Sequence, residues 1–303
     1  MSQTCTFRRL PTVLAVLLLA GTVAGCSTPA ESSRPRIVVT TAILGDVVGA
    51  MVGDRAEVEV VMPRGASPHD FAPSARQAVA MREADALVVN GWGFEAGLAD
   101  TIDAARRSGV DVFAAVSAVR PLATGTRDPH FFTDPARMRR AARAIAAHLA
   151  AKVPTLRTDA FRAAARAYDR RLVQAEAEAE HALAVVPPAR RILVTDHEVF
   201  GYFAERFGFR VVGTVIPGLS TQSEPSVRGL TALAATIRAR GVPAIFASTS
   251  SPSRLAERLA DGVGVSVEIV SLFSESLGPV GSDGATYLAM VTTNARRIAT
   301  ALR

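Results

Sequence analysis

The chain has 303 residues, of which 49% are hydrophobic and 20% are charged. At roughly 100–200 residues per domain, this length predicts two domains or lobes that each bury a core, and it excludes a fibrous or wholly disordered chain. The formal net charge is +6, but the basic residues are spread along the chain and form no stripe with aromatic residues, so no nucleic-acid partner is expected.

The first residues predict export. A short basic segment, residues 1–9, precedes an apolar run at residues 10–20. That run is too short to cross ~30 Å of hydrocarbon as a helix, but it has the length of a signal-peptide core. Residues 23–26, Val-Ala-Gly-Cys, then resemble the lipobox of bacterial lipoproteins. The resemblance implies a signal peptide at 1–25 and a lipidated tether at 26–36, with the acyl chains attached to Cys26.

Two cysteines occur in the chain, Cys5 and Cys26. Cleavage before Cys26 would remove the first, and lipidation would consume the second. The mature protein is therefore expected to have no internal disulfide and no thiolate metal site.

After the tether, short β-branched runs alternate with longer amphipathic segments, a rhythm typical of parallel α/β folds. We expect strands at 37–40, 58–62, 86–90 and 112–115, and again at 192–195, 211–216, 244–247 and 267–271. Helices are expected between them, including 225–240, 252–261 and 284–302. The prediction is an α/β fold of two lobes, 37–156 and 188–303, each with a mostly parallel four-stranded sheet and flanking helices.

Local signals mark several helix ends. Asp134-Pro135 and Ser251-Pro252 each combine a capping residue with a proline that suits the first helical turn. Gly241 and Gly262 come directly after the expected helices 225–240 and 252–261, and they are expected to end them.

Between the lobes, residues 158–186 repeat apolar side chains every three or four positions and contain no Gly or Pro. One continuous helix of ~43 Å is predicted here. This rigid helix, assigned to residues 157–187, would join the lobes as a spine. A coiled-coil arm is the alternative, but the apolar stripe is mostly alanine and spans few heptads.

Three of the five histidines lie in loop-like settings near an acidic residue: His69, His130 and His197. Metal-bound imidazoles commonly donate their second N–H to a carboxylate, so these three are candidate ligands. Spacing alone leaves a structural role open. His148 and His181 lie inside predicted helices and are not expected to bind metal.

Motifs around these histidines narrow the choice, and they occur in a fixed order along the chain. They are Pro68-His69-Asp70-Phe71 with Pro73-Ser74, Val89-Asn90-Gly91 with Glu95, Asp128-Pro129-His130-Phe131 with Asp134-Pro135, His197 before Phe200-Gly201-Tyr202-Phe203 and Phe207-Gly208, Ser220-Thr221 to Glu224-Pro225-Ser226, and Asp283 with Tyr287, Met290 and Asn294. Over residues 36–303 the chain resembles the metal-binding receptor lipoproteins of bacterial ABC importers for zinc and manganese, the adhesin-type lipoproteins.

The resemblance implies a metal site of His69, His130, His197 and Asp283, two ligands from each lobe. Three imidazoles and one carboxylate suit Zn²⁺ as the transported ligand, and Mn²⁺ is the alternative. His197 carries this preference, because relatives that resemble manganese receptors commonly have Glu there. Two departures are visible: residues 121–127 lack the His-rich loop of many zinc receptors, and Ser248 stands where many relatives have Glu.

The resemblance further implies an extracytoplasmic solute-binding lipoprotein, not an enzyme, which delivers its metal to an ABC permease with a cytoplasmic ATPase. We expect a monomer, anchored through Cys26 to the outer face of the cell membrane or in the periplasm.

Two other functional classes fit the sequence less well. An exported zinc hydrolase would need an open coordination position, which Asp283 would close, and His197-Glu198 is not followed by the second histidine of an HExxH motif because Gly201 stands there. A surface adhesin is suggested by the family's older name, but no separate adhesive patch is visible in the sequence.

Overall fold

The first four strands form one parallel sheet, as predicted. In the computed structural model, which describes residues 1–4, 6, 34–251 and 253–303, its order is β2-β1-β3-β4. The strands are β1 (Arg36–Val39), β2 (Glu57–Val60), β3 (Ala86–Val89) and β4 (Val112–Ala114). Residues 7–25 of the predicted signal peptide and Cys26, the predicted lipidation site, lie outside the described residues.

The second sheet is also four-stranded and parallel, in the order β6-β5-β7-β8. Its strands are β5 (Ile192–Thr195), β6 (Arg210–Thr214), β7 (Ala244–Ser248) and β8 (Glu268–Leu272). The central strands β3, β5 and β7 are buried along their whole length. Helices on both faces of a parallel sheet explain why these strands read as short continuous apolar runs.

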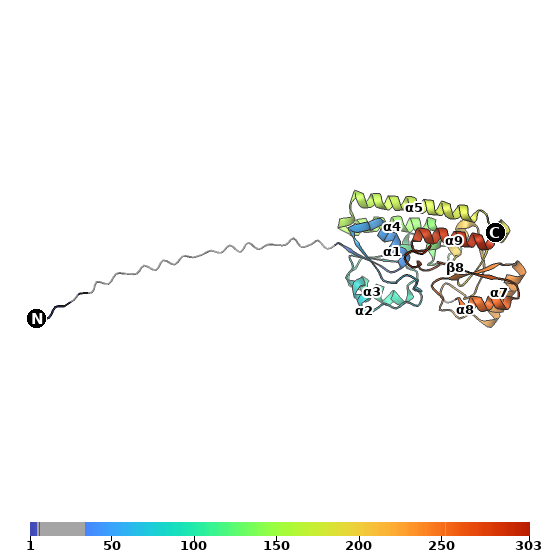
Figure 1. Ribbon diagram of the computed structural model, residues 1–303, viewed down its shortest axis with the longest axis horizontal. Coiled ribbons are helices and arrows are strands. Elements are labelled where there is room, and N and C mark those ends of the chain that lie inside the picture. Colours follow the sequence, from blue (N-terminus) through green and yellow to red (C-terminus); the bar gives the residue numbers. More distant parts are fainter. Residues whose placement is uncertain (5, 7–33, 252) are drawn as a thin grey trace. The chain divides into compact units, whose positions relative to one another are not determined.

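Helices connect the strands and cover both sheets (Figure 1). The α-helices of the described residues are α1 (Ala42–Val52), α2 (Ala75–Arg82), α3 (Ala99–Arg107), α4 (Pro135–Lys152), α5 (Asp159–Leu183), α6 (Gly201–Phe207), α7 (Val227–Arg240), α8 (Arg254–Val263) and α9 (Tyr287–Leu302). Within the described part of the chain, no helix is long and apolar enough to cross a bilayer.

The long linking helix is α5, with 25 residues. It is shorter than the predicted segment because Thr158 caps its start and the helix stops at Leu183, before Val186. At 1.5 Å per residue it is ~37 Å long. It packs along α4, α1 and α9, and so joins the helical layers of both sheets.

The helix-end predictions had mixed outcomes. Asp134 caps α4 with its side chain, and Gly241 ends α7 with a φ of 59°. The prediction for Gly262 was wrong, because α8 runs on to Val263 and ends at Gly264, whose φ is 77°. Its start also differs: α8 begins at Arg254, and Pro252 lies outside the described residues.

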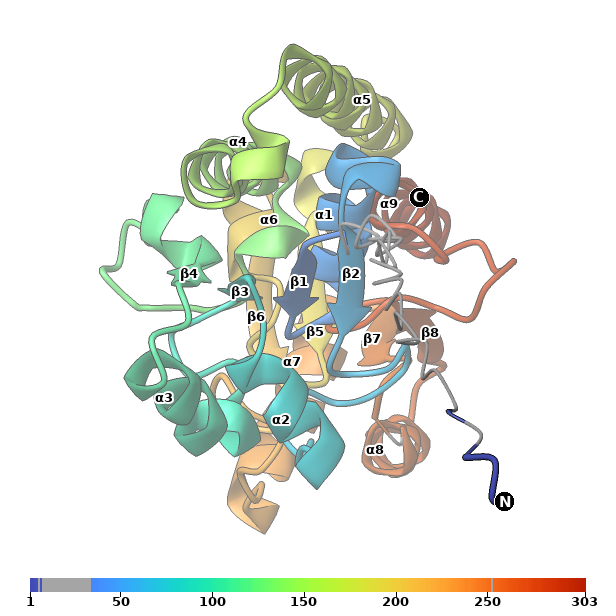
Figure 2. The ribbon, with the colours of Figure 1, turned by 90° about the vertical axis from the view of Figure 1, so that its left-hand side faces the viewer.

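We expected one hydrophobic core in each lobe, but the largest core is shared by both halves of the chain. The largest buried cluster contains residues of both halves, among them Ile43 of α1, Leu172 of α5, Phe200 and Tyr287. Two smaller clusters fill the opposite faces: one lies between the first sheet and α2 and α3, the other between the second sheet and α7 and α8. Figure 2 shows these outer helix pairs on the far side of the sheets from α5. The two halves therefore share one central core.

Candidate metal centre

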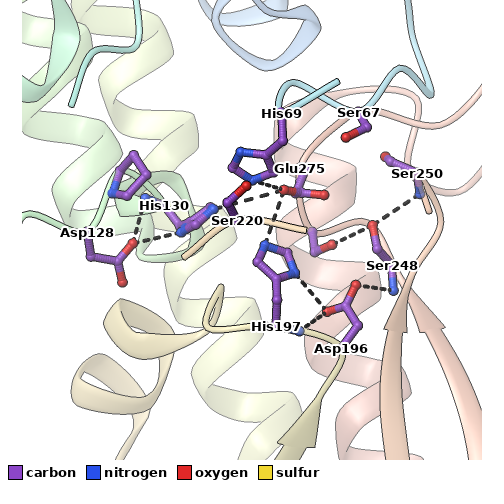
Figure 3. A network of polar contacts seen from close by, with 12 residues as sticks. Ser67, His69, Asp128, His130, Asp196, His197, Ser220, Ser248, Ser250 and Glu275 are labelled. Atoms are coloured by element: carbon purple, nitrogen blue, oxygen red, sulfur yellow. Dashed lines mark hydrogen bonds and ion pairs between the residues drawn. The ribbon is translucent and has the colours of Figure 1, made fainter. Parts of the chain in front are cut away.

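Four buried side chains from distant parts of the chain meet in one cluster: His69, His130, His197 and Glu275 (Figure 3). Each offers one nitrogen or oxygen atom, and these atoms all lie within 4.8 Å of one another. The residues are 4%, 0%, 0% and 2% exposed. Among the described residues this is the one group of His, Cys, Asp and Glu that has the spacing of a metal site.

Sheet topology explains the meeting point. His197 follows the end of β5 by two residues, Glu275 follows β8 by three, and His69 and His130 lie on loops that follow β2 and β4. In a parallel sheet all of these loops leave from the same edge, the carboxyl ends of the strands, where such folds place ligand sites. The second sheet supplies two of the groups and the first sheet the other two.

The carboxylate of Glu275 lies at the centre of the three rings. Its Oε1 is 2.7 Å from Nε2 of His69, 3.2 Å from Nε2 of His197 and 4.0 Å from Nε2 of His130. Within the described chain, none of these three nitrogens and neither oxygen of Glu275 has a partner with hydrogen-bond geometry. Buried polar atoms are rarely left in that state, and a cation between them would satisfy all of them.

Two aspartates orient two of the rings. Asp128 Oδ1 lies 2.8 Å from Nδ1 of His130 and also accepts its backbone N–H at 2.9 Å. Asp196 Oδ1 lies 3.2 Å from Nδ1 of His197, a charge contact without hydrogen-bond geometry, and accepts the backbone N–H of that residue at 2.9 Å. In both histidines the carboxylate contact leaves Nε2 for the cluster, which is the arrangement of metal-binding imidazoles.

Ser248 takes part in this support. Its backbone N–H donates to Asp196 Oδ2 at 3.1 Å, and its hydroxyl oxygen accepts from Ser274 at 2.8 Å. Although Ser248 carries no charge, His197 still has a carboxylate beside it, because Asp196 supplies the negative charge and Ser248 holds Asp196 in place.

Burial and charge act in opposite directions on these groups. Burial lowers the pKa of His197, but its contacts with Asp196 and Glu275 outweigh burial and raise it to about 10. Burial alone would raise the pKa of Glu275, yet His197 and His69 hold it well below its usual range. Burial lowers the pKa of His130, and Asp128 offsets this only in part. Without an ion, the Glu275 charge is balanced by a proton on His197.

The loop of His69 is held by a close backbone approach and by the second half of the chain. A Cβ atom on Gly97 would lie 2.1 Å from the carbonyl oxygen of Phe71, so glycine is needed for this contact. From the other side, Gln222 donates its Nε2–H to the carbonyl of His69 at 2.8 Å.

The loop of His130 is fixed by three side chains. Asn90 donates to the carbonyl of Pro129 at 3.0 Å. From the second half, Tyr202 donates its hydroxyl to the carbonyl of Asp128 at 3.0 Å, and Tyr287 donates to that of Phe132 at 2.8 Å. Donors from both halves therefore set the position of this candidate ligand.

The loop that carries Glu275 is connected to the loop that carries His69. The guanidinium of Arg64 donates to the carbonyls of Gly278 at 3.1 Å and Ala285 at 2.5 Å. The backbone N–H of Gly65 donates to the hydroxyl of Ser276 at 2.9 Å. These bonds join residues more than 200 positions apart in sequence, and they bring Glu275 to His69.

The structure brings the three predicted histidines together but not Asp283. The Asp283 side chain is 54% exposed, and its Oδ2 accepts from Arg297 at 2.8 Å. The expectation of Asp283 in the cluster is corrected, and Glu275 takes that place. Position gave only a partial signal: Glu275 is the first acidic residue after β8, at the edge where the histidines converge, but Asp283 lies on the same connection.

The two excluded histidines lie elsewhere. His181 is exposed near the end of α5. His148 of α4 is half-buried: its Nε2 contacts Asp111, and its ring lies 4.6 Å from that of Phe113.

Comparison with known proteins gave matches over nearly the whole compact unit. Residues 37–301 match the family model described as zinc-uptake complex component A, periplasmic. The zinc-binding protein TroA of Treponema pallidum is 31% identical over 288 residues, covering 92% of each chain. Its solved structure, a periplasmic zinc-binding protein, superimposes with a TM-score of 0.83 at 30% identity, covering 89% of this chain and 99% of that one. The manganese ABC transporter substrate-binding lipoprotein PsaA of Streptococcus pneumoniae is 26% identical over 311 residues, covering 97% of this chain and 99% of PsaA.

Proposed function

Because the chain belongs to the family of the periplasmic zinc-uptake component A, we propose that it is the extracytoplasmic receptor of an ABC importer for a divalent transition metal. The family consists of solute-binding receptors, not enzymes. The observation that carries the site assignment is the buried set of three Nε2 atoms and one carboxylate, all without hydrogen-bond partners among the described residues. In this proposal, His69, His130, His197 and Glu275 hold the ion.

We propose Zn²⁺ as the cargo. Three imidazole nitrogens and one carboxylate form a nitrogen-rich donor set, which suits zinc better than manganese. The relatives are named for either metal, TroA for zinc and PsaA for manganese. The choice therefore depends on the donor atoms of this chain, and on His197 in particular.

The remaining parts of the proposal concern place and partners. Export through residues 1–25 and lipidation of Cys26 would hold the receptor at the membrane that contains its permease. The permease and its ATPase are separate chains. A monomer is sufficient for metal capture, since one chain supplies all four candidate ligands.

Metal analysis and a paired titration test this proposal. Protein purified without added metal should contain Zn²⁺, and competitive titration should give tighter binding of Zn²⁺ than of Mn²⁺. Glu275→Gln should abolish stoichiometric binding because it removes the negative charge at the centre of the cluster. The matched control is Asp283→Asn, which removes a carboxylate from the next loop segment and should leave affinity unchanged.

The result for His197→Glu separates the two metals. Replacing a nitrogen donor with an oxygen donor should lower the affinity for zinc and reduce the ratio of zinc affinity to manganese affinity. Tighter manganese binding by the unmodified protein would overturn the zinc assignment, and metal loss from Asp283→Asn with retention in Glu275→Gln would overturn the site.

A further inference from the structure

Helices α4 and α5 run side by side in Figure 1, and their side chains line a groove. Its volume is about 590 Å³, within the range of ~300–1,000 Å³ found for small-molecule sites. The floor is apolar and buried: Met51 of α1, Ala142 and Ala146 of α4, and Phe161 of α5. The alanine side chains are too small to fill the space between the two helices, so a trough with an apolar floor remains.

The rim of this groove is basic. Arg143, Arg162, Arg166 and Arg170 line it, with Asp169 as the acidic residue among the lining side chains. Asp169 is bound by Arg143 at 2.6 and 2.7 Å, and Arg162 is bound to Asp159. Among the described residues, Arg166 and Arg170 form no ion pair within 4.0 Å. Helix α4 itself carries four arginines, one lysine and no acidic residue.

An apolar trough with a cationic rim has the chemistry to bind an anionic amphiphile. The trough can take an acyl chain, and the guanidinium groups can bind a phosphate with directed hydrogen bonds. A neutral apolar ligand would leave Arg166 and Arg170 without a counter-charge, and an inorganic anion would leave the apolar floor in water.

The groove also lies close to the point where the tether enters the compact unit. Arg34, the first residue of that unit, donates to the carbonyl of Asp54 at 3.5 Å. Met51 on the groove floor is three residues before Asp54, so their Cα atoms are at most ~11 Å apart. Cys26 is eight residues before Arg34, which spans at most ~28 Å when fully extended. Lipid on Cys26 would therefore keep the groove near the bilayer surface.

We propose that the α4–α5 groove is a docking site for anionic membrane lipid, with the acyl chain on the alanine floor and the headgroup phosphate at Arg166 and Arg170. This inference rests on the proposed membrane anchor and is independent of the metal identity. The groove lies at the opposite end of the first sheet from the metal ligands, because α1 runs back from the carboxyl end of β1 and Met51 is near its last residue. Lipid binding therefore leaves the four ligands free to hold their ion.

Vesicle sedimentation tests the proposal. The protein is the mature chain, residues 26–303, which contains the whole compact unit, with Cys26→Ser so that no covalent lipid contributes. We expect it to bind vesicles of equimolar phosphatidylcholine and phosphatidylglycerol but not vesicles of phosphatidylcholine alone. Arg166→Gln with Arg170→Gln should weaken binding about tenfold or more, since each basic side chain near an anionic surface accounts for about fivefold.

Two further variants separate the groove from general charge. Arg228→Gln with Arg240→Gln makes the same charge change at exposed positions of α7 and should leave vesicle binding nearly unchanged; an equal loss would overturn the proposal. Ala147→Trp, at an exposed position on the groove wall, should block the acyl chain without altering charge. Undiminished binding of Ala147→Trp would also overturn it.

The remaining outcome concerns a different occupant. If the chain dimerises without vesicles in analytical ultracentrifugation and Ala147→Trp abolishes that dimer, the groove binds a second copy and the lipid proposal is wrong. Zinc titration of every variant keeps this test separate from the proposed function. Loss of vesicle binding with unchanged zinc affinity removes only the lipid site, whereas absence of zinc binding in all proteins removes the receptor function.

Discussion

Asp128 holds His130 at two points, through the ring Nδ1 at 2.8 Å and through the backbone N–H at 2.9 Å. The same carboxylate oxygen makes both contacts, so the imidazole orientation is locked to its own backbone. Nε2 is then the atom left for the cluster. The binding energy of an ion at this candidate ligand should thus depend on a residue that does not touch the ion.

Asp128→Asn should therefore weaken zinc binding by about 10–100-fold, the usual effect of removing a carboxylate that supports a histidine ligand. The amide keeps the size of the side chain but loses its charge. Competitive titration with a chelator measures the change. Asp103→Asn, an exposed carboxylate on α3 paired with Arg106, is the control, and equal affinities for Asp128→Asn and this control would contradict the assigned role.

Arg64→Ala should accelerate zinc release. Arg64 donates to the carbonyls of Gly278 and Ala285, and these bonds hold the Glu275 loop against the first half. Loss of hydrogen bonds from a charged donor should raise the dissociation rate by about tenfold or more, with a smaller effect on metal-free stability. Stopped-flow release into a chelator gives the rate.

Arg64→Lys should restore part of the slow release, because the ammonium group still reaches carbonyl oxygens. Arg76→Ala, on the exposed surface of α2, should release zinc at the unmodified rate. If Arg64→Ala lowers the melting temperature of the metal-free protein but leaves the release rate unchanged, Arg64 has only a structural role.

Gly97→Ala should reduce both stability and zinc affinity. The new Cβ would lie 2.1 Å from the carbonyl oxygen of Phe71, so the backbone next to the His69 loop must move, at a cost of about 1–3 kcal/mol. Gly262→Ala is the control: its Cβ meets nothing within 4 Å, and helix stability should rise slightly. Thermal melts with and without zinc distinguish a general from a site-specific loss.

Zinc binding near pH 7 should release about one proton per ion, because His197, with its pKa raised to about 10, is protonated in the metal-free protein. Affinity should then increase with pH up to about that value. Calorimetry in buffers of different ionisation enthalpy counts the proton. A heat of binding that is the same in all buffers would contradict the proton on His197.

The contacts of His197 with Glu275 and Asp196 also make the stability of the metal-free protein depend on pH. Because the pKa of His197 is raised, its contribution to stability is complete below the ordinary histidine pKa of 6.5 and is lost as the pH rises through about 10. The lowered pKa of Glu275 contributes stability above 4.5, which is lost as the pH falls through the folded-state value. The metal-free protein should therefore be stabilised most by these groups between pH 4.5 and 6.5.

The sequence was informative where local patterns decide structure. All eight strands were predicted. The central strands are short apolar runs because they are buried on both faces, as in β5 (Ile192–Thr195), whereas edge strands such as β2 are partly exposed and were predicted from their β-branched residues. Helix ends were predicted less well: Gly241 ends α7, but α8 continues past Gly262 because Gly264 adopts the positive φ that ends the helix.

The fourth candidate ligand could not be chosen from spacing. Glu275 and Asp283 lie on the same connection between β8 and α9, and sequence gives no direction for either side chain. The deciding contacts come from far away: Arg64 pins the loop so that Glu275 points inward, and Arg297 of α9 binds Asp283 at the surface. The shared core was missed for the same reason, since it depends on how α1, α5 and α9 pack.

That shared core has a consequence for hydrogen exchange. Buried amides of α5 touch none of the four candidate ligands, yet α5 belongs to the cluster that includes Tyr287 and Phe132 beside the site. Amides in such a core exchange with solvent only when the whole unit opens. An ion bound at the cluster makes that opening rarer in proportion to its concentration over Kd. Deuterium uptake deep in α5 thus reports on occupancy of a site that the helix does not contact.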